Sequence, residues 1–167
     1  VSSFFMSTTA TIKDIPLIQV LWDKSWICHY LGIISHALID CMLNLMYSED
    51  EITCQFNNPN HHYYLLGDAE NFYGIMGFEN HYEENTTKLH RIYITEDGKG
   101  KGLGKEAIQF LKNQILEVGD QRITLAVNKQ NPSYHFYLSQ GFKVYEEGVF
   151  DIGNGFVMDD YLMEWNA

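Results

Sequence analysis

A glycine-rich loop, placed between an expected strand and an expected helix, constrains the fold of this chain most. The segment "ITEDGKGKGLGKEAIQFL" (94–111) places four glycines and three lysines within the eight residues from Gly98 to Lys105. Apolar residues then recur at helical spacing as far as Ile115, and Gly119 is expected to end the helix. A strand, a glycine-rich turn and a helix N-terminus present unpaired N–H groups and the positive end of the helix dipole. This combination suits a phosphate group.

Two well-known phosphate-binding motifs do not match this loop. A dinucleotide fingerprint that starts at Gly98 needs glycine where Leu103 stands, and one that starts at Gly100 needs glycine where Lys105 stands. A Walker loop needs Ser or Thr after Gly-Lys, whereas Lys105 precedes Glu106. The loop therefore predicts a phosphate-bearing ligand of another class, and the alternative is a solvated turn that binds nothing.

The rest of the chain has an acidic balance. Its 167 residues suit a single globular domain, with 14% aromatic residues and a formal net charge of -11. A pI near 4.9 argues against nucleic acid as a partner, because nucleic-acid readers need a basic surface. An acidic surface instead attracts cations. No apolar run approaches the ~18 residues of a membrane span.

The cysteines and histidines do not form a metal-binding pattern. Cys28, Cys41 and Cys54 are odd in number and include no CxxC pair, which indicates reduced thiols and a cytoplasmic protein. His61 and His62 are adjacent on an expected strand and should point to opposite faces. We therefore expect no metal site.

The start of the chain carries no secretory signal. The segment "VSSFFMSTTATIKD" lacks a basic region and a long apolar core. Met6 could be the natural first residue, with residues 1–5 a leader or an expression remnant. The expected domain is then 6–167.

The order of expected elements places helices early and alternates strands with helices late. An alternating segment at 9–14 predicts a first strand, and helices are expected from Ile15, from Ser35 and, with a capping box to Glu51, from Ser48. A short helix capped by Asn131 follows the last single strand. The other expected strands cover 61–67, 71–78, 87–95 and 122–128, followed by a hairpin of 142–152 and 156–165. This order predicts a mixed α/β (α+β) fold.

Two blocks of the sequence resemble the GNAT superfamily of acetyl-CoA-dependent N-acetyltransferases. The loop at 99–104 reads K-G-K-G-L-G against the family's Q/R-x-x-G-x-G/A, with Lys99 in the first position. Lysine keeps the charge of arginine but loses its planar fork. The segment "NPSYHFYLSQGFKVYEE" is similar to the family's N-x-x-(A/S)-x-x-F-Y-x-x-x-G-F block. The two blocks cover roughly residues 88 to 146 and imply a mixed sheet flanked by helices and split at the acetyl-CoA site.

The resemblance implies which residues bind acetyl-CoA. The strand at 88–95 would offer backbone groups to the pantetheine arm and to the oxyanion of a tetrahedral intermediate. The loop amides would bind the pyrophosphate, and Asn131 and Phe136 would line the other side of the arm. The expected cofactor-binding residues are Ile92, Tyr93, Ile94, Lys99, Gly100, Lys101, Gly102, Leu103, Gly104, Lys105, Asn131 and Phe136.

Acetyl transfer needs an acid for the leaving thiolate and a way to deprotonate the amine. Tyr137 occupies the tyrosine position of the family block and is the expected acid. The glutamate that some family members use as base corresponds to Lys88, so that assignment fails here. An alternation of period two places Lys88, His90, Ile92 and Ile94 on one face and makes His90 the first candidate base. Glu79 is the second candidate, and loss of the proton to water is the alternative.

The N-terminal half is expected to shape the acceptor pocket. Trp26 and Tyr30 share a helix face, and Tyr47 follows on the next helix. Aromatic rings near carboxylates suit an alkylammonium group. Further candidates are Met46, Tyr63, Tyr64 and Tyr73 for the rings, and Glu79, Glu83, Glu84, Asp159 and Asp160 for the charge.

Several functions are compatible with these residues. The segments "WICHY", "MYS" and "GFVMDDYLME" resemble bacterial diamine and polyamine acetyltransferases, so a small-molecule polyamine is the expected acceptor. An N-terminal peptide amine is the alternative acceptor. A non-catalytic acyl-CoA-binding module is the alternative from another class, and the late hairpin could form a homodimer interface.

Overall fold

The computed structural model describes residues 6–21, 48–67, 71–153 and 155–167. Within them, seven strands form one sheet in the order β1-β2-β3-β4-β5-β7-β6. Neighbouring strands are antiparallel except β4 and β5, which are parallel. The strands are β1 (Met6–Thr9), β2 (His61–Gly67), β3 (Phe72–Glu83), β4 (Thr86–Ile94), β5 (Arg122–Asn128), β6 (Lys143–Gly153) and β7 (Phe156–Asn166).

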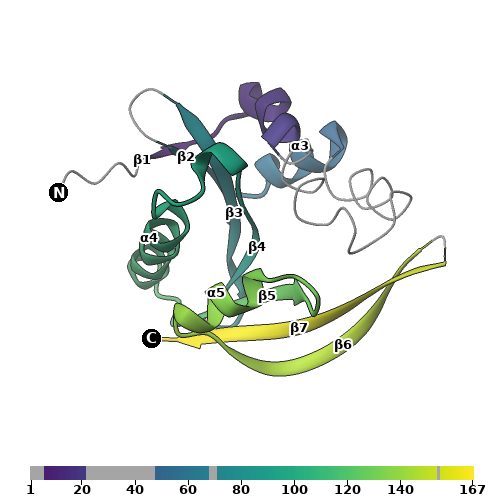
Figure 1. The fold of residues 1–167 in the computed structure, drawn as a ribbon. Helices are drawn as coiled ribbons and strands as arrows, with labels where there is room; N and C mark the ends of the chain where they lie inside the picture. The colour runs from purple at the N-terminus through teal and green to yellow at the C-terminus, as the bar shows by residue number, and fades with distance from the viewer. Residues whose placement is uncertain (1–5, 22–47, 68–70, 154) are drawn as a thin grey trace.

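Helices cover both faces of the sheet. The described helices are α3 (Glu49–Asn57), α4 (Leu103–Glu117), α5 (Ser133–Ser139), the short 3-10 turns η1 (Ile12–Asp14) and η2 (Glu96–Gly98), and a helical segment over 15–21. Figure 1 shows α4 on one side of strands β2 to β4, with α3 and the segment 15–21 on the other. Among the described helices, none is long and apolar enough to cross a lipid bilayer.

The mixed α/β fold predicted from the sequence is confirmed, and one expected strand is wrong. Residues 9–14 do not continue as a strand, because β1 ends at Thr9 and pairs with β2 as Thr9↔Tyr64. Asp14 Oδ2 accepts a hydrogen bond from the Thr11 N–H (2.8 Å) and closes the 3-10 turn. A side chain that satisfies its own local backbone competes with strand pairing, and alternation of residue types cannot reveal this.

The other expected elements lie within a few residues of their predicted bounds. Strand β3 continues five residues beyond the predicted Phe78, to Glu83. Ser48 caps α3 as expected, since its Oγ accepts from the Glu51 N–H (3.2 Å). The Glu51 carboxylate accepts from Gln55 Nε2 (2.9 Å), so only the Ser48 half of the expected capping box is observed among the described residues. The helix expected from Ser35 lies outside the described residues.

The core lies between α4 and the sheet. One stripe of α4 is fully buried against apolar side chains of β2 to β5 and β7. Each buried leucine or isoleucine side chain of this stripe contributes roughly 1.5–3 kcal/mol by leaving water. The α4 residues of this stripe are Leu103, Ala107, Ile108, Leu111 and Ile115, and their partners include Leu66, Met76, Leu89, Leu125 and Met163.

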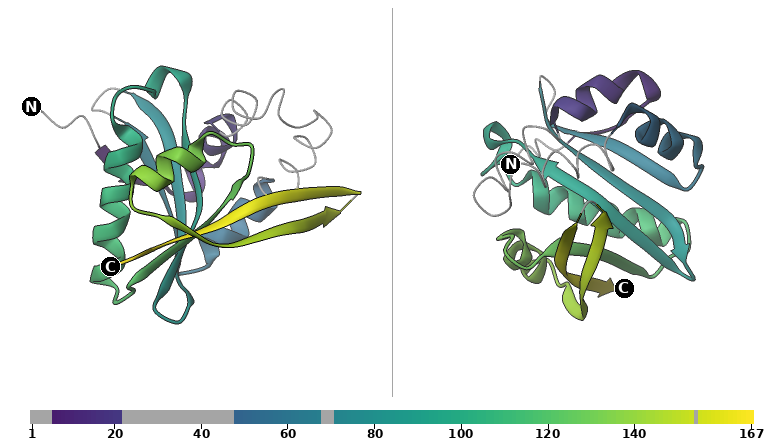
Figure 2. Two further views of the ribbon diagram at one scale, coloured as in Figure 1. Left: turned by 60° about the horizontal axis from the view of Figure 1, so that its bottom comes forward. Right: turned by 90° about the vertical axis from the view of Figure 1, so that its right-hand side faces the viewer.

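Strands β4 and β5 pair only over their first three residues. The partners run from Thr86↔Arg122 to Lys88↔Thr124. Asp120, 1% exposed, fixes this junction by accepting hydrogen bonds from Thr87 Oγ1 (2.7 Å) and from the His81 N–H (2.9 Å). Beyond the junction the two strands run apart, as Figure 1 shows. The sheet is therefore split, with β6 and β7 extending as a long hairpin from the β5 side (Figure 2).

Candidate active site

The glycine-rich loop ends in a helix N-terminus, as the sequence predicts. Gly100 and Gly102 have φ of +77° and +76°, the left-handed region that costs glycine nothing. Helix α4 starts at Leu103 directly after Gly102. A Cβ on Gly104 would lie 3.2 Å from Cζ of Phe136, so glycine here lets α4 and α5 approach closely. The N–H groups of the first helical turn have no partner within the helix and are available to an anion.

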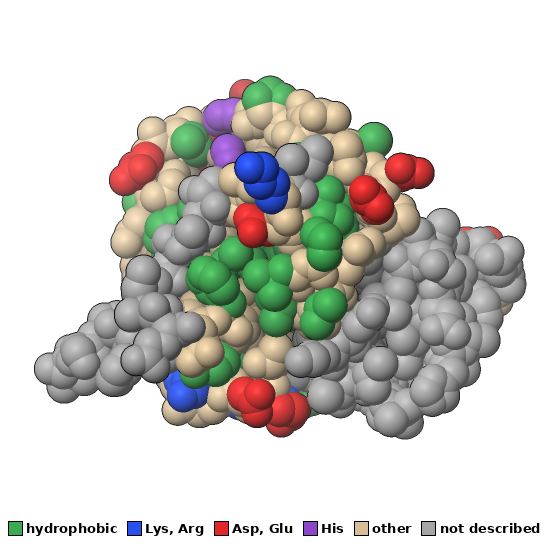
Figure 3. Space-filling view, turned by 90° about the horizontal axis from the view of Figure 1, so that it is seen from above, with side chains coloured by type: hydrophobic (Ala, Val, Ile, Leu, Met, Phe, Trp, Pro, Cys, Tyr) green, Lys and Arg blue, Asp and Glu red, His purple; other side chains and the backbone are tan. Residues whose placement is uncertain are grey.

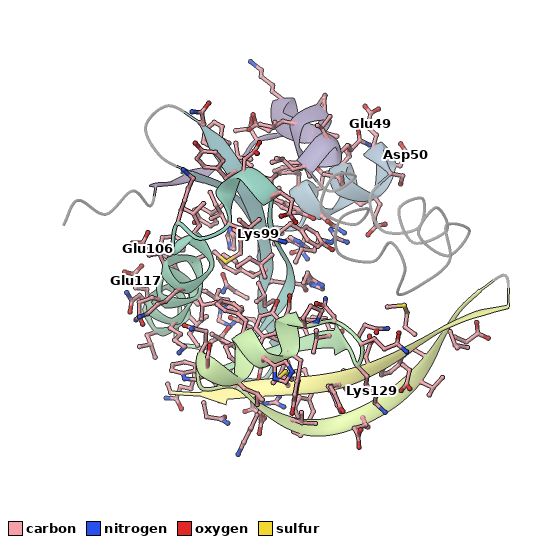
Figure 4. All side chains as sticks on the ribbon, viewed as in Figure 1. Glu49, Asp50, Lys99, Glu106, Glu117 and Lys129 are labelled. Atoms are coloured by element: carbon pink, nitrogen blue, oxygen red, sulfur yellow. The ribbon has the colours of Figure 1, made fainter. Side chains whose placement is uncertain are left out.

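A cavity of about 400 Å³ lies between this loop, β4 and α5. Its walls contain most of the predicted cofactor-binding residues: Ile92, Ile94, Lys99, Gly100, Gly102, Leu103, Gly104, Lys105 and Phe136. Lys101 does not line it, because its Nζ lies over the ring of Tyr73, 4.9 Å from the centroid. Lys99, which Figure 4 labels, lines the cavity and forms an ion pair with Glu96 of η2 (2.5 Å). We call this cavity the cofactor cleft.

Two residues of the cofactor cleft were missed by sequence reasoning. Gly98 lines it and packs so closely that a Cβ there would lie 2.5 Å from Cβ of Tyr73. Ser133 lines it at the start of α5 and donates its N–H to Asn131 Oδ1 (2.9 Å). The N-cap of α5 is Pro132 rather than the expected Asn131, which accepts the Ser133 N–H from a position one residue earlier.

A second cavity, of about 70 Å³, occupies the split between β4 and β5. The segments 89–93 and 125–127 form its two walls, with Asn131 and Ser133 from the start of α5. Tyr93 and Asn131, predicted to bind the cofactor, line this split cavity rather than the cleft. Tyr137, Ile92 and Ser133 line both cavities. Tyr137 is 9% exposed and packs edge-on against Phe142, which holds its ring where cleft and split meet.

His90 and Glu79 are joined by a hydrogen bond between His90 Nε2 and Glu79 Oε1 (3.1 Å). His90 also lines the split cavity, whereas Glu79 does not. Burial, and then the charges of Lys88 and Arg91, lower the pKa of His90 to about 3. A neutral imidazole therefore donates Nε2–H to the Glu79 carboxylate at neutral pH.

The predicted alternation along β4 is wrong at His90. Phe78 pairs with Leu89 and Gly77 pairs with Arg91, so His90 is the extra residue of a β-bulge. Ile92 and Ile94 pack against the α4 core, whereas His90 stacks on His61 of β2. The bulge shifts the period of two by one residue, and His90 therefore does not share a face with Ile92.

His61, Glu79 and His90 bring three potential metal-ligand atoms within 4.8 Å of one another. The two imidazole rings are stacked, with 9° between their planes. Lone pairs of a ring nitrogen lie in the ring plane, so two stacked rings do not direct their nitrogens at one ion. The cluster is therefore described as a hydrogen-bonded histidine stack rather than a metal centre.

Most of the predicted acceptor residues do not converge on the split. Tyr63 is 1% exposed and hydrogen bonds with Gln55 and Arg91 under α3. Tyr64 packs between Phe78 and Phe110 on the α4 side. Trp26, Tyr30, Met46 and Tyr47 lie outside the described residues.

The acidic candidates are dispersed. Glu83 pairs with Arg122 (3.3 Å), and Asp159 pairs with Lys129 (3.0 Å) beside the β6–β7 hairpin, where Figure 4 labels Lys129. Glu84 is exposed on the turn after β3. The face seen in Figure 3 also carries separate acidic side chains around a hydrophobic centre rather than one acidic surface. Asp160 differs from these residues because it is buried.

The sheet is split, a glycine-rich loop precedes a helix start, and a tyrosine lies where the two cavities meet. This is the arrangement expected of an acyl-CoA-dependent transferase. The sequence profile of the acetyltransferase (GNAT) family matches residues 30–142. The chain belongs to this family and uses acetyl-CoA as its acetyl donor. The donor fits the cleft, where the positive-φ glycines and Gly104 leave room that a side chain would fill.

Solved structures with the same fold cover nearly the whole chain. The PaiA N-acetyltransferase from Thermoplasma acidophilum, in complex with coenzyme A, is 21% identical with a TM-score of 0.83 over 98% of this chain and 99% of that chain. The spermidine N-acetyltransferase from Vibrio cholerae, in complex with CoA and spermine, is 19% identical with a TM-score of 0.74 over 99% and 96%. The ribosomal-protein-S18-alanine N-acetyltransferase from Escherichia coli is 14% identical with a TM-score of 0.72 over 97% and 93%. Comparison with curated proteins found no match.

Proposed function

We propose that the protein transfers the acetyl group of acetyl-CoA to a primary amine of a small diamine or polyamine. The observation that carries this proposal is the position of Tyr137, whose ring borders both the cofactor cleft and the split cavity. A donor that enters from the cleft and an amine that enters from the split would meet at this ring.

The residues around this junction have distinct roles in the proposed reaction. The amides of the loop from Gly100 to Gly104 bind the pyrophosphate of the donor, and Lys105 adds a positive charge. Strand β4 pairs with β3 along its length but, among the described residues, pairs with β5 only as far as Lys88, so the pantetheine arm lies along the β4 edge that faces the split. Tyr137 donates its phenolic proton to the sulfur when the thioester bond breaks.

The incoming ammonium must lose a proton before its nitrogen attacks. A base works best when its pKa lies near the working pH, and burial lowers the pKa of His90 to about 3. His90 is therefore a weak base in this fold, in contrast to its sequence-based assignment. We infer that the proton leaves through water in the split, with the His90–Glu79 pair orienting that water.

Charge favours a cationic acceptor. The chain has a formal net charge of -11, so a polyamine is drawn to it and an anionic acceptor is repelled. One distant structural neighbour is a spermidine N-acetyltransferase, and another is a ribosomal-protein-S18-alanine N-acetyltransferase. The dispersed surface acids favour a small polycation that reaches one buried carboxylate, rather than a peptide that needs an extended surface.

The test is acetyl-CoA consumption, followed as free thiol release, across spermidine, putrescine, lysine and short peptides. Amine-dependent release with a preference for polyamines is the expected result. If only peptides cause thiol release, the acceptor is an N-terminal peptide amine rather than a polyamine. Binding of acetyl-CoA without release for any amine would overturn the catalytic assignment and favour an acyl-CoA-binding module.

A further inference from the structure

A third cavity, of about 410 Å³, lies over β5, β7 and β6 on the face away from the α4 core. Thr124 and Ala126 of β5 line it and alternate with the core residues Ile123 and Val127. We call it the outer cavity. Its walls combine the aromatic rings of Tyr82, Tyr145 and Phe150 with the carboxylates of Glu83, Glu146 and Asp160, and with Lys88.

The outer cavity adjoins the split cavity. Leu125 and Ala126 of β5 line both of them. The split cavity in turn shares Tyr137 with the cofactor cleft. The split cavity therefore shares lining residues with the cofactor cleft and with the outer cavity. An acceptor whose reacting amine lies in the split would extend its remaining chain toward the outer cavity.

Asp160 is the one outer-cavity carboxylate that the described residues leave buried and unpaired. The residue is 9% exposed, and its Oδ1 has no hydrogen-bond partner among the described residues. Burial, and then the charge of Asp159, raise the pKa of Asp160 to about 6. An unpaired buried carboxylate is costly, and a bound cation would offset that cost.

The other charges around the outer cavity do not satisfy Asp160. Glu83 is paired with Arg122, and Glu146 is exposed on β6. Lys88 has its Nζ 4.6 Å from the ring centroid of Tyr82, on the β3–β4 side. Lys88 repels an ammonium group from the part of the outer cavity beside β4. A cation is therefore favoured beside Asp160 of β7.

We propose that Asp160 binds the distal ammonium of a diamine or polyamine acceptor while the reacting amine enters the split. This inference rests on the proposed function and names its specificity-determining residue. The ring of Phe150 lines the path of the methylene chain of the acceptor, whereas the ring of Tyr145 already carries the Arg122 guanidinium, 4.9 Å from its centroid. The site selects acceptors by a second positive charge, which a monoamine lacks.

The test compares α,ω-diamines of increasing length with monoalkylamines in which a methyl group replaces the distal ammonium. In the unmodified protein we expect a higher kcat/KM for diamines than for matched monoamines. Asp160→Asn keeps the size of the side chain and removes its charge. We expect it to lower kcat/KM for the best diamine about tenfold or more and to leave the monoamine value within about twofold.

Asp159→Asn is the matched control. Asp159 is the neighbouring residue, is exposed and pairs with Lys129. We expect this variant to keep the preference for diamines. An equal loss for diamines and monoamines in Asp160→Asn, or no loss for either, would overturn the inference.

Direct binding separates this inference from the proposed reaction. Spermidine is titrated calorimetrically into the protein with coenzyme A present. Suppose that the unmodified protein binds spermidine, that Asp160→Asn abolishes this binding, and that no amine is acetylated. This result would support the cation site and reject the proposed reaction. Spermidine binding that is equal in both proteins would overturn the cation site even if acetylation is observed.

Discussion

The imidazole rings of His61 and His90 stack face to face, with their centroids 4.9 Å apart. They come from β2 and β4, and Glu79 of the intervening β3 lies 3.8 Å from Nδ1 of His61 and 3.1 Å from Nε2 of His90. Burial is the main cause that lowers the pKa of each ring to about 3. Both rings are therefore neutral at neutral pH, and the fold depends on their remaining so.

This stack predicts a loss of stability in acid. The pKa of each histidine is about 6.5 in the unfolded chain and about 3 in the folded protein, so the unfolded state binds more protons between these values. The free energy of unfolding should fall as the pH drops below 6.5. His90→Asn removes one of the two titrating groups and should lessen the fall between pH 7.5 and pH 5 by about 1–2 kcal/mol. Urea denaturation at the two pH values measures it, and an unchanged fall would contradict the prediction.

Tyr137→Phe is predicted to slow acetyl transfer without weakening donor binding. The ring packing against Phe142 is kept, so the melting temperature should change little. Loss of a general acid should lower kcat about 10²- to 10⁴-fold. Steady-state kinetics and calorimetric titration with acetyl-CoA measure the two effects. A large loss of acetyl-CoA affinity with normal kcat would show that Tyr137 binds the donor instead.

His90→Gln is predicted to have a modest effect on turnover. Since the pKa of His90 is about 3, the ring is not the group that titrates near neutral pH. We expect kcat to fall less than about tenfold, with the acidic limb of the kcat–pH profile unmoved. A shift of that limb would restore His90 as the general base.

Gly102 and Gly119 form a matched pair at the two ends of α4. Both have positive φ, +76° and +90°, and a Cβ on either would meet no atom within 4 Å. Replacement of either by alanine should cost about 1–2 kcal/mol of unfolding free energy, because the backbone conformation is strained for an L-residue. Only Gly102→Ala should also weaken acetyl-CoA binding, since only Gly102 lines the cofactor cleft. Equal affinities in the two variants would contradict the assignment of the loop as the phosphate site.

Asp160→Asn is predicted to stabilise the protein. The pKa of Asp160 is about 6 in the folded protein and 3.8 in the unfolded chain, so the folded state binds more protons between these values. The stabilisation from this proton is complete below pH 3.8 and is lost as the pH rises through 6. At pH 7.5 the variant should unfold with a free energy about 1–3 kcal/mol higher than that of the unmodified protein. At pH 4 the difference should disappear. Chemical denaturation at both pH values checks this, and a lower stability of the variant at pH 7.5 would count against an unpaired carboxylate.

Much of the fold and of the cofactor cleft could be predicted from local sequence. The local signals are the glycine spacing, the stripe of apolar residues that follows it, and the Asn-Pro sequence before α5. Elements β2, α4, β5 and α5 lie close to the residue ranges that these local signals predict. The wrong interpretation at Thr9 to Asp14 and the missed bulge at His90 have a common cause. Whether a residue pairs, turns or bulges is decided by its partners, such as Asp14 for Thr11 and Gly77 for Arg91.

The sequence by itself determined the family, the donor and the position of a glycine-rich loop before a helix, because these depend on the spacing of residues that are neighbours in the chain. Only the tertiary structure decided the rest of the site. It brought Tyr137 to the meeting point of two cavities and placed His90 in a buried stack that lowers its pKa. It also buried Asp160 with no hydrogen-bond partner for Oδ1 in the part of the chain that the structure describes. These properties depend mainly on desolvation by segments that are distant in the sequence, and no local pattern in a sequence records that burial.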